Sequence, residues 1–159
     1  MKKYLIALLS LCSCGSETNG DFVVKNITVY SDVGELNQEE FKSAIENTYQ
    51  GFEDTGIGTK RINKFDSKYL SIYIRKDLIH CAGAKSGLCY GVCYGCCEIE
   101  VFQNDPCMGK TALVHELVHW VLYWKAMDED ADHNDPRFYG PDSITANANS
   151  AIQEEFCAE

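Results

Sequence analysis

Two histidines stand four residues apart with a glutamate between them, in the run His115-Glu116-Leu117-Val118-His119. Residues four apart on a helix lie on one face, about one turn from each other, so both imidazoles can bind one metal ion. Glu116 is rotated by about 100° from His115 and can approach a water on that metal without binding the metal itself. Zinc lowers the pKa of such a water to roughly 7, and a carboxylate then accepts its proton during attack on a carbonyl. The spacing therefore predicts two zinc ligands, His115 and His119, and a general base, Glu116.

A catalytic zinc site takes a third ligand from the protein and leaves its fourth position to water. His133 is the leading candidate, because the chain beyond the helix is long enough to turn back and deliver an imidazole, which suits zinc. Glu129 and Asp132 are carboxylate alternatives, and His80 is the only other histidine. The third ligand is therefore expected from this set, with His133 first.

The elements that must position these residues follow from hydrophobic patterning. Residues 109–126 are apolar on nearly every side, which predicts a buried helix. Two histidines and a glutamate in such a helix are costly to bury without a partner, and a metal ion is such a partner. The other predicted elements are strands over 22–30, 69–75 and 97–102, a helix of about four turns after the Asn37 cap that is ended by Gly51, Gly56 and Gly58, and a helix over 143–157. This order predicts an α+β domain.

The histidine pair and a downstream segment together resemble a known family. His133 begins the run His133-Asn134-Asp135-Pro136-Arg137-Phe138, fourteen residues after His119. The two pieces resemble the zincin metallopeptidases and, within them, are similar to SprT-like and related minimal proteins. The resemblance implies zinc ligation by His115, His119 and His133, with Glu116 as general base. It also implies a small zincin-like domain whose mixed or antiparallel sheet packs on the metal-binding helix. The strand over 97–102 would then be the edge strand to which a peptide substrate adds.

Tyr139 follows this segment directly and has two possible roles. Its hydroxyl could donate a hydrogen bond to an oxyanion. Packing or surface exposure is the commoner role of such a tyrosine, and we favour it here.

The first residues have the pattern of an export signal. Met1-Lys2-Lys3 precedes a short apolar stretch, which predicts a signal peptide over residues 1–13. The run Leu11-Cys12-Ser13-Cys14 resembles a bacterial lipobox, which implies lipidation of Cys14 and a polar tether over 14–20 before a domain over 21–159. A plain secretory signal cleaved nearby is the alternative. Both interpretations predict an exported protein, and the first predicts a lipoprotein anchored to the membrane at the cell envelope or cell surface.

Composition limits the partners and the compartment. The chain has 24 acidic and 14 basic residues and a formal net charge of −10, which argues against a nucleic-acid partner. Nine cysteines indicate an oxidising compartment and a disulfide-rich fold. An odd number follows Cys14, so three bridges and one thiol are expected, with the pairing open among Cys81, Cys89, Cys93, Cys96, Cys97, Cys107 and Cys157.

Two functions fit these observations. The first is a zinc-dependent peptidase that hydrolyses peptides or proteins with a metal-activated water and Glu116 as general base. The alternative is a non-catalytic, disulfide-stapled exported lipoprotein that binds a partner and holds a structural zinc. A structural site is closed by four ligands, for which Cys107 is the first suspect, and it does not require a general base. Glu116 therefore separates the two functions.

Overall fold

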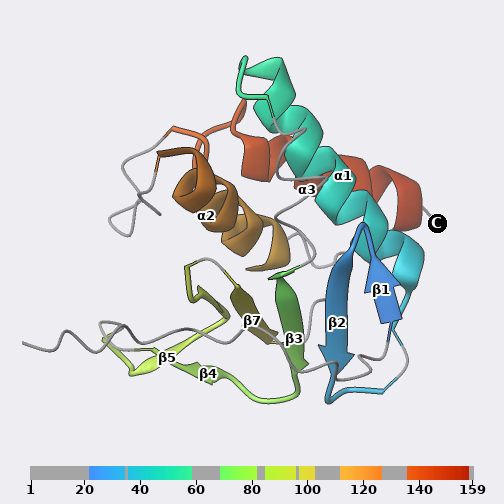
Figure 1. The fold of residues 1–159 in the computed structure, drawn as a ribbon, viewed down its shortest axis with the longest axis vertical. Helices are drawn as coiled ribbons and strands as arrows, with labels where there is room; N and C mark the ends of the chain where they lie inside the picture. Colours follow the sequence, from blue (N-terminus) through green and yellow to red (C-terminus); the bar gives the residue numbers. More distant parts are fainter. Residues whose placement is uncertain are drawn as a thin grey trace, which may run out of the picture.

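Three helices lie on one face of a five-stranded sheet, and a short hairpin lies on the other side (Figure 1). A computed structural model describes residues 22–34, 36–58, 69–81, 85–95, 97–102, 112–126 and 136–157. Their elements are β1 (Phe22–Val24), β2 (Ile27–Ser31), α1 (Gln38–Asp54), β3 (Ser71–Arg75), β4 (Ile79–His80), β5 (Leu88–Cys89), β6 (Gly91–Cys93), β7 (Glu98–Phe102), α2 (Ala112–Ala126) and α3 (Ile144–Phe156). The α+β class and the mixed sheet are confirmed.

The strand order in the sheet is β1-β2-β3-β7-β6. The three central strands, β2, β3 and β7, run parallel, while β1 and β6 pair antiparallel at the two edges. The prediction that residues 97–102 form the edge strand is therefore wrong, because β7 lies between β3 and β6. Residues 91–93 add a further strand on the outer side of β7 and become the edge.

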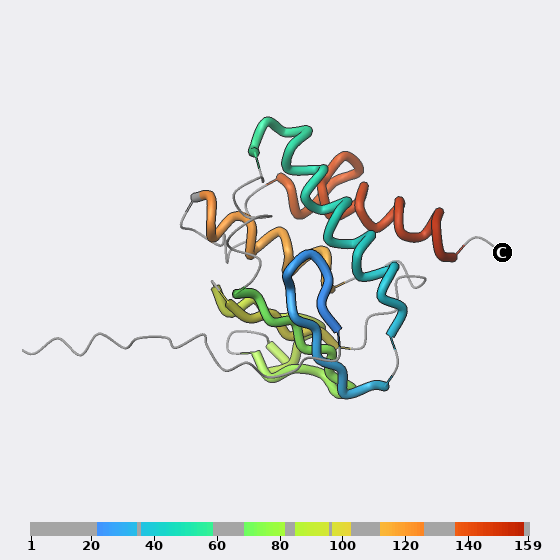
Figure 2. The backbone as a smooth tube through the Cα atoms, turned by 45° about the vertical axis from the view of Figure 1, so that its right-hand side comes forward, coloured from blue at the N-terminus to red at the C-terminus, as the bar shows by residue number. Residues whose placement is uncertain are grey.

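The helices begin where the sequence offers a capping side chain. The Asn37 side chain accepts the Glu39 N–H at 3.1 Å, and the Ser143 hydroxyl accepts the Ala146 N–H at 3.1 Å. Gly51 was expected to end α1 but lies inside it, and a Cβ at this position would be 2.9 Å from the Ile144 side chain. The glycine thus serves the close approach of α1 and α3, which lie side by side in Figure 2.

The core lies between the sheet and the helices. Alternate residues of the central strands point into it, and α2 crosses it as a mostly apolar helix that packs against β6 and β7. Buried members from the strands are Ile27, Val29, Ile72, Ile74, Ile99 and Val101, and those from α2 are Leu113, Val114, Leu117, Val118, Trp120, Val121 and Leu122. The prediction of a buried helix here is confirmed.

Two local features differ from the sequence-based expectation. Residues 22–30 form two strands instead of one, because Lys25 and Asn26 take positive φ angles of 50° and 65° and make a tight turn between β1 and β2. The cysteine-rich stretch from Ile79 to Cys93 holds β4, β5 and β6, which patterning did not predict. None of the helices in the described ranges is long and apolar enough to cross a membrane.

Candidate functional site

Helix α2 brings the two predicted histidine ligands together. The rings of His115 and His119 have centroids 5.0 Å apart, as expected for residues one turn apart on one face. His119 is buried and His115 is half-buried, although the helix around them is almost entirely apolar. Two imidazoles thus lie next to each other where water has limited access.

A second wall of the site comes from the segment after the predicted third ligand. The Phe138 ring is fully buried, with its centroid 5.0 Å from the His115 ring and 4.3 Å from the His119 ring. The carbonyl of the preceding residue, Arg137, accepts the Thr145 backbone N–H at 3.3 Å, which fastens this segment to the first turn of α3. Residues 136–138 are therefore held against the histidine pair.

Tyr139 lies at the margin of this wall. Its ring centroid is 6.2 Å from that of His115, and the residue is 63% exposed. This exposure fits the favoured expectation of a surface role.

Glu116 points to the edge strand β6. The residue is 6% exposed, and its carboxylate accepts a hydrogen bond from the Cys93 backbone N–H. Burial raises the pKa of Glu116 from 4.5 to about 8, because the charged form loses hydration, and the bond from Cys93 opposes this rise. The candidate base is thus a buried carboxyl held by backbone.

Gly91 is the residue that lets this carboxyl approach the strand. A Cβ added to Gly91 would lie 2.6 Å from Oε1 and 2.8 Å from Cγ of Glu116. No other residue type fits here without a shift of strand or side chain, since real Cβ atoms do not approach so closely. No sequence pattern indicated that Gly91 or the backbone N–H of Cys93 would contact Glu116. The alternation of Tyr90, Val92 and Tyr94 was the one signal that a strand passes here.

The third metal ligand cannot be assigned from the described part of the chain. In that part no group of three or more His, Cys, Asp or Glu side chains is arranged to hold a metal ion. His133, Glu129 and Asp132 lie outside the described residues. His80 lies on β4, in the hairpin across the sheet from α2, and is exposed. It is therefore not brought to the histidine pair.

The structure describes five of the seven cysteines among which pairing was expected. Cys81 and Cys89 form a disulfide between β4 and β5, with Cα atoms 5.9 Å apart. Cys97 and Cys157 each take part in a disulfide. Cys93 keeps its thiol, with Sγ 3.6 Å from the Gly95 carbonyl oxygen. The remaining candidates, Cys14, Cys96 and Cys107, lie outside the described residues.

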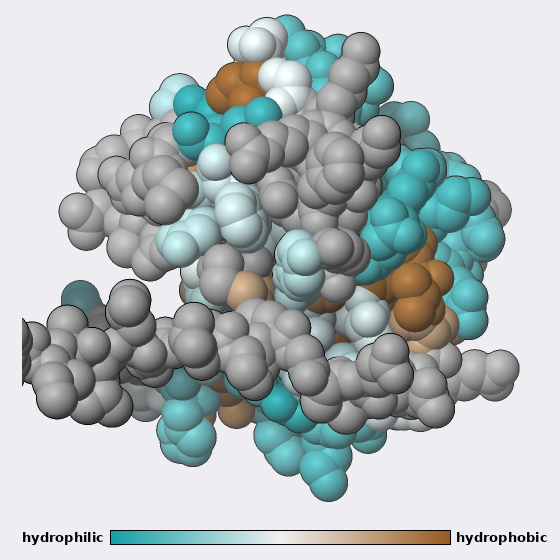
Figure 3. Space-filling model, viewed as in Figure 1, coloured by the Kyte–Doolittle hydropathy of each residue, from teal (hydrophilic) through white to brown (hydrophobic). Residues whose placement is uncertain are grey.

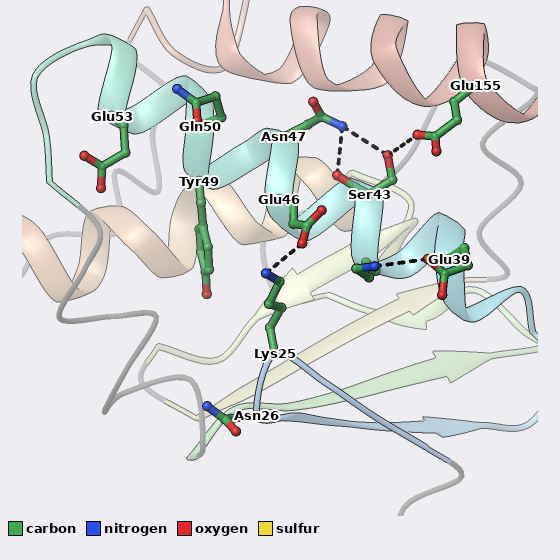
Figure 4. A pocket seen from close by; sticks show the side chains of 11 residues that line it. Lys25, Asn26, Glu39, Ser43, Glu46, Asn47, Tyr49, Gln50, Glu53 and Glu155 are labelled. Atoms are coloured by element: carbon green, nitrogen blue, oxygen red, sulfur yellow. Dashed lines mark hydrogen bonds and ion pairs between the residues drawn. The ribbon is translucent and has the colours of Figure 1, made fainter.

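A groove of about 830 Å³ lies beside α1 and holds none of the predicted site residues (Figure 4). Its charged side chains are largely satisfied by one another: Lys25 pairs with Glu46 at 2.7 Å, and the Ser43 hydroxyl donates to Glu155 at 2.9 Å. In Figure 3, hydrophilic surface on the right-hand side of the molecule borders a smaller hydrophobic patch. Size alone thus does not make it the functional site.

Three kinds of comparison bear on identity. Comparison of this chain with protein-family models, with curated proteins and with solved structures finds no match.

Proposed function

We propose that this chain is a zinc-dependent peptidase of the zincin type, similar to the minimal SprT-like proteins. One observation carries the proposal: the adjacent rings of His115 and His119 lie on a buried helix whose Glu116 reaches an edge strand. Two imidazoles one turn apart on one helix face, with a carboxyl on the adjacent residue, form a set of side chains that suits a metal ion and a water bound to it. A metal ion and a peptide are the ligands that fit these groups.

His133 is the third ligand in this proposal. Phe138, only five residues later in the chain, already touches the His119 ring, and five residues can span up to roughly 17 Å. His133 is therefore within reach of the histidine pair. Bound zinc would act there as a Lewis acid that polarises a carbonyl and makes water more acidic.

The chain's own residues supply binding and proton transfer. An extended peptide pairs with the outward-facing backbone of β6. Glu116 takes a proton from the attacking water as its oxygen bonds to the peptide carbon, and returns that proton to the departing amine nitrogen when the C–N bond breaks. Beside a bound cation the pKa of Glu116 would fall from about 8 toward neutrality, where one carboxyl can do both tasks.

A direct experiment compares three purified proteins on a peptide library: wild type, Glu116→Gln and Glu154→Gln. Glu154 is exposed on α3, so its variant controls for the loss of one carboxylate. We expect Glu116→Gln to keep zinc, measured by mass spectrometry, and to lose about 10² to 10⁴ in kcat/KM. Equal inactivity of all three with zinc retained would instead favour a structural zinc in a non-catalytic binding protein.

We also propose that the protein is exported and lipid-anchored through Cys14. The disulfide between Cys81 and Cys89 supports an oxidising compartment. Metabolic labelling with a fatty acid, followed by membrane fractionation, tests the anchor. Cys14→Ala should remove the label and release the protein, whereas an unchanged distribution would favour a plain secretory signal.

A further inference from the structure

The sheet face away from the helices carries an aromatic and acidic surface beside the edge strand. We call it the tyrosine–glutamate patch, and it consists of Tyr90, Val92, Tyr94, Glu98 and Glu100. Strand register places its members on one face, because Val92 pairs with Glu100, and the Tyr94 N–H bonds to the Glu98 carbonyl across β6 and β7. The neighbours of Val92 in β6, Gly91 and Cys93, pair with buried residues and point to α2 instead.

Two of the largest exposed rings of the described chain stand on either side of a smaller residue in this patch. Tyr90 is 66% exposed and Tyr94 is 50% exposed, and Val92 lies midway between them. Tyrosine suits a partner that is part apolar and part polar. The patch therefore presents two exposed rings with a smaller side chain between them.

Two carboxylates, from Glu98 and Glu100 of β7, lie next to these rings. The Glu98 carboxylate makes no hydrogen bond or ion pair with any described residue. Glu100 accepts a bond from the Tyr94 hydroxyl at 3.4 Å and pairs with Arg75, which Asp32 also binds at 3.2 Å. Arg75 is thus shared between two carboxylates, and Lys76 lines the same hollow as Tyr94 and Glu100, so Glu98 is the carboxylate of the patch that has no ion pair among the described residues. The whole chain has 24 acidic and 14 basic residues, and this net negative charge also favours a cationic partner.

The backbone of β6 aligns such a partner with the patch. Tyr90 and Tyr94 bond through their backbones to β7, so the alternate backbone groups, at Gly91 and Cys93, face away from β7. The Cys93 N–H is bound by Glu116, and the Gly91 N–H is the outward donor that can pair with an added strand. A peptide strand added there would direct alternate side chains onto the open face, about 10 Å (two strand spacings) from β7. A lysine or arginine can lay its stem along Val92, between the two rings, and extend its charge to the β7 carboxylates.

We propose that the tyrosine–glutamate patch selects extended peptides that carry a lysine or arginine on the open-face side of β6. The inference rests on the proposed peptidase function and names its substrate class. A basic side chain there gains ring contacts and a carboxylate, whereas an acidic one meets Glu98 and Glu100.

Binding is measured on the full chain carrying Glu116→Gln, so that bound peptide stays intact. Three fluorescent peptides differ at one position only, which holds lysine, glutamine or glutamate. The lysine peptide should bind about five- to tenfold more tightly than the glutamine peptide, and the glutamate peptide more weakly than either. Adding Glu98→Gln should remove most of the difference, and so should adding Val92→Arg, while adding Glu154→Gln should leave it unchanged.

Cleavage of the same peptides by the wild type separates the two claims. A lysine preference in binding without any cleavage would refute the peptidase and keep the patch. Cleavage with equal binding of all three peptides would keep the peptidase and refute the patch. A preference that persists in both Glu98→Gln and Val92→Arg would also refute the patch, because the selectivity would then arise elsewhere.

Discussion

Gly91→Ala tests the contact between the edge strand and the candidate base. The new Cβ would stand 2.8 Å from Glu116 Cγ, whereas carbon atoms prefer about 3.5 to 4.0 Å, so the side chain or strand must move by about 1 Å. Overpacking of this kind costs about 1 to 3 kcal/mol of stability. A misplacement of about 1 Å costs roughly 10² in rate. We therefore expect kcat/KM on a peptide substrate to fall about 100-fold.

The control is Gly58→Ala, because a Cβ at Gly58 meets no atom of the described residues within 4 Å and Gly58 does not have a positive φ. This variant should keep wild-type activity and stability. Zinc content should be the same in both variants, since Glu116 is not a proposed ligand. Wild-type kcat/KM in a folded, zinc-loaded Gly91→Ala protein would refute the contact as a determinant of catalysis.

Three further outcomes are expected. In metal-free protein, the free energy of unfolding should fall by up to about 5 kcal/mol between about pH 4.5 and 8, because folded Glu116 keeps a proton that the unfolded chain releases. Urea titrations at several pH values measure this fall, which should be smaller in Glu116→Gln. Phe138→Ala should lower the free energy of unfolding by about 3 to 5 kcal/mol, because a large buried ring is removed. It should also weaken zinc retention under mild chelation, because the ring packs on both histidines, and unchanged retention would contradict this second effect. Cys81→Ser should lower the free energy of unfolding by about 2.5 kcal/mol, because the unfolded chain would no longer be restrained by a loop with a sequence separation of 8. An unchanged denaturation midpoint would argue against that disulfide.

Local patterns predicted most of the regular elements. The Asn37 and Ser143 side chains cap α1 and α3, and the alternation in residues 71–75 and 98–102 matches β3 and β7. Such signals depend only on neighbours in the chain. The parallel pairing of β2 with β3 and of β3 with β7 joins distant segments, and patterning within one segment does not specify it.

In the candidate site, too, contacts within one helix could be predicted from the sequence and contacts between distant segments could not. The one-turn spacing of His115 and His119 is a property of one helix, so the sequence alone predicted that their rings would be neighbours. The contact of Glu116 with Gly91 depends on which strand forms the edge, and the short strand β6 in a cysteine-rich segment gave a weak signal. The role of Gly91 was therefore visible only in three dimensions.

The bond from Thr145 to the Arg137 carbonyl has a consequence for biosynthesis. One wall of the histidine site is fastened to α3, which follows α2 in the chain and in turn packs on α1. A ribosome delivers the chain from its amino end, so this wall cannot be secured until the residues of α3 have emerged. A nascent chain that has released α2 would thus carry the two histidines without this wall until α3 has folded against α1.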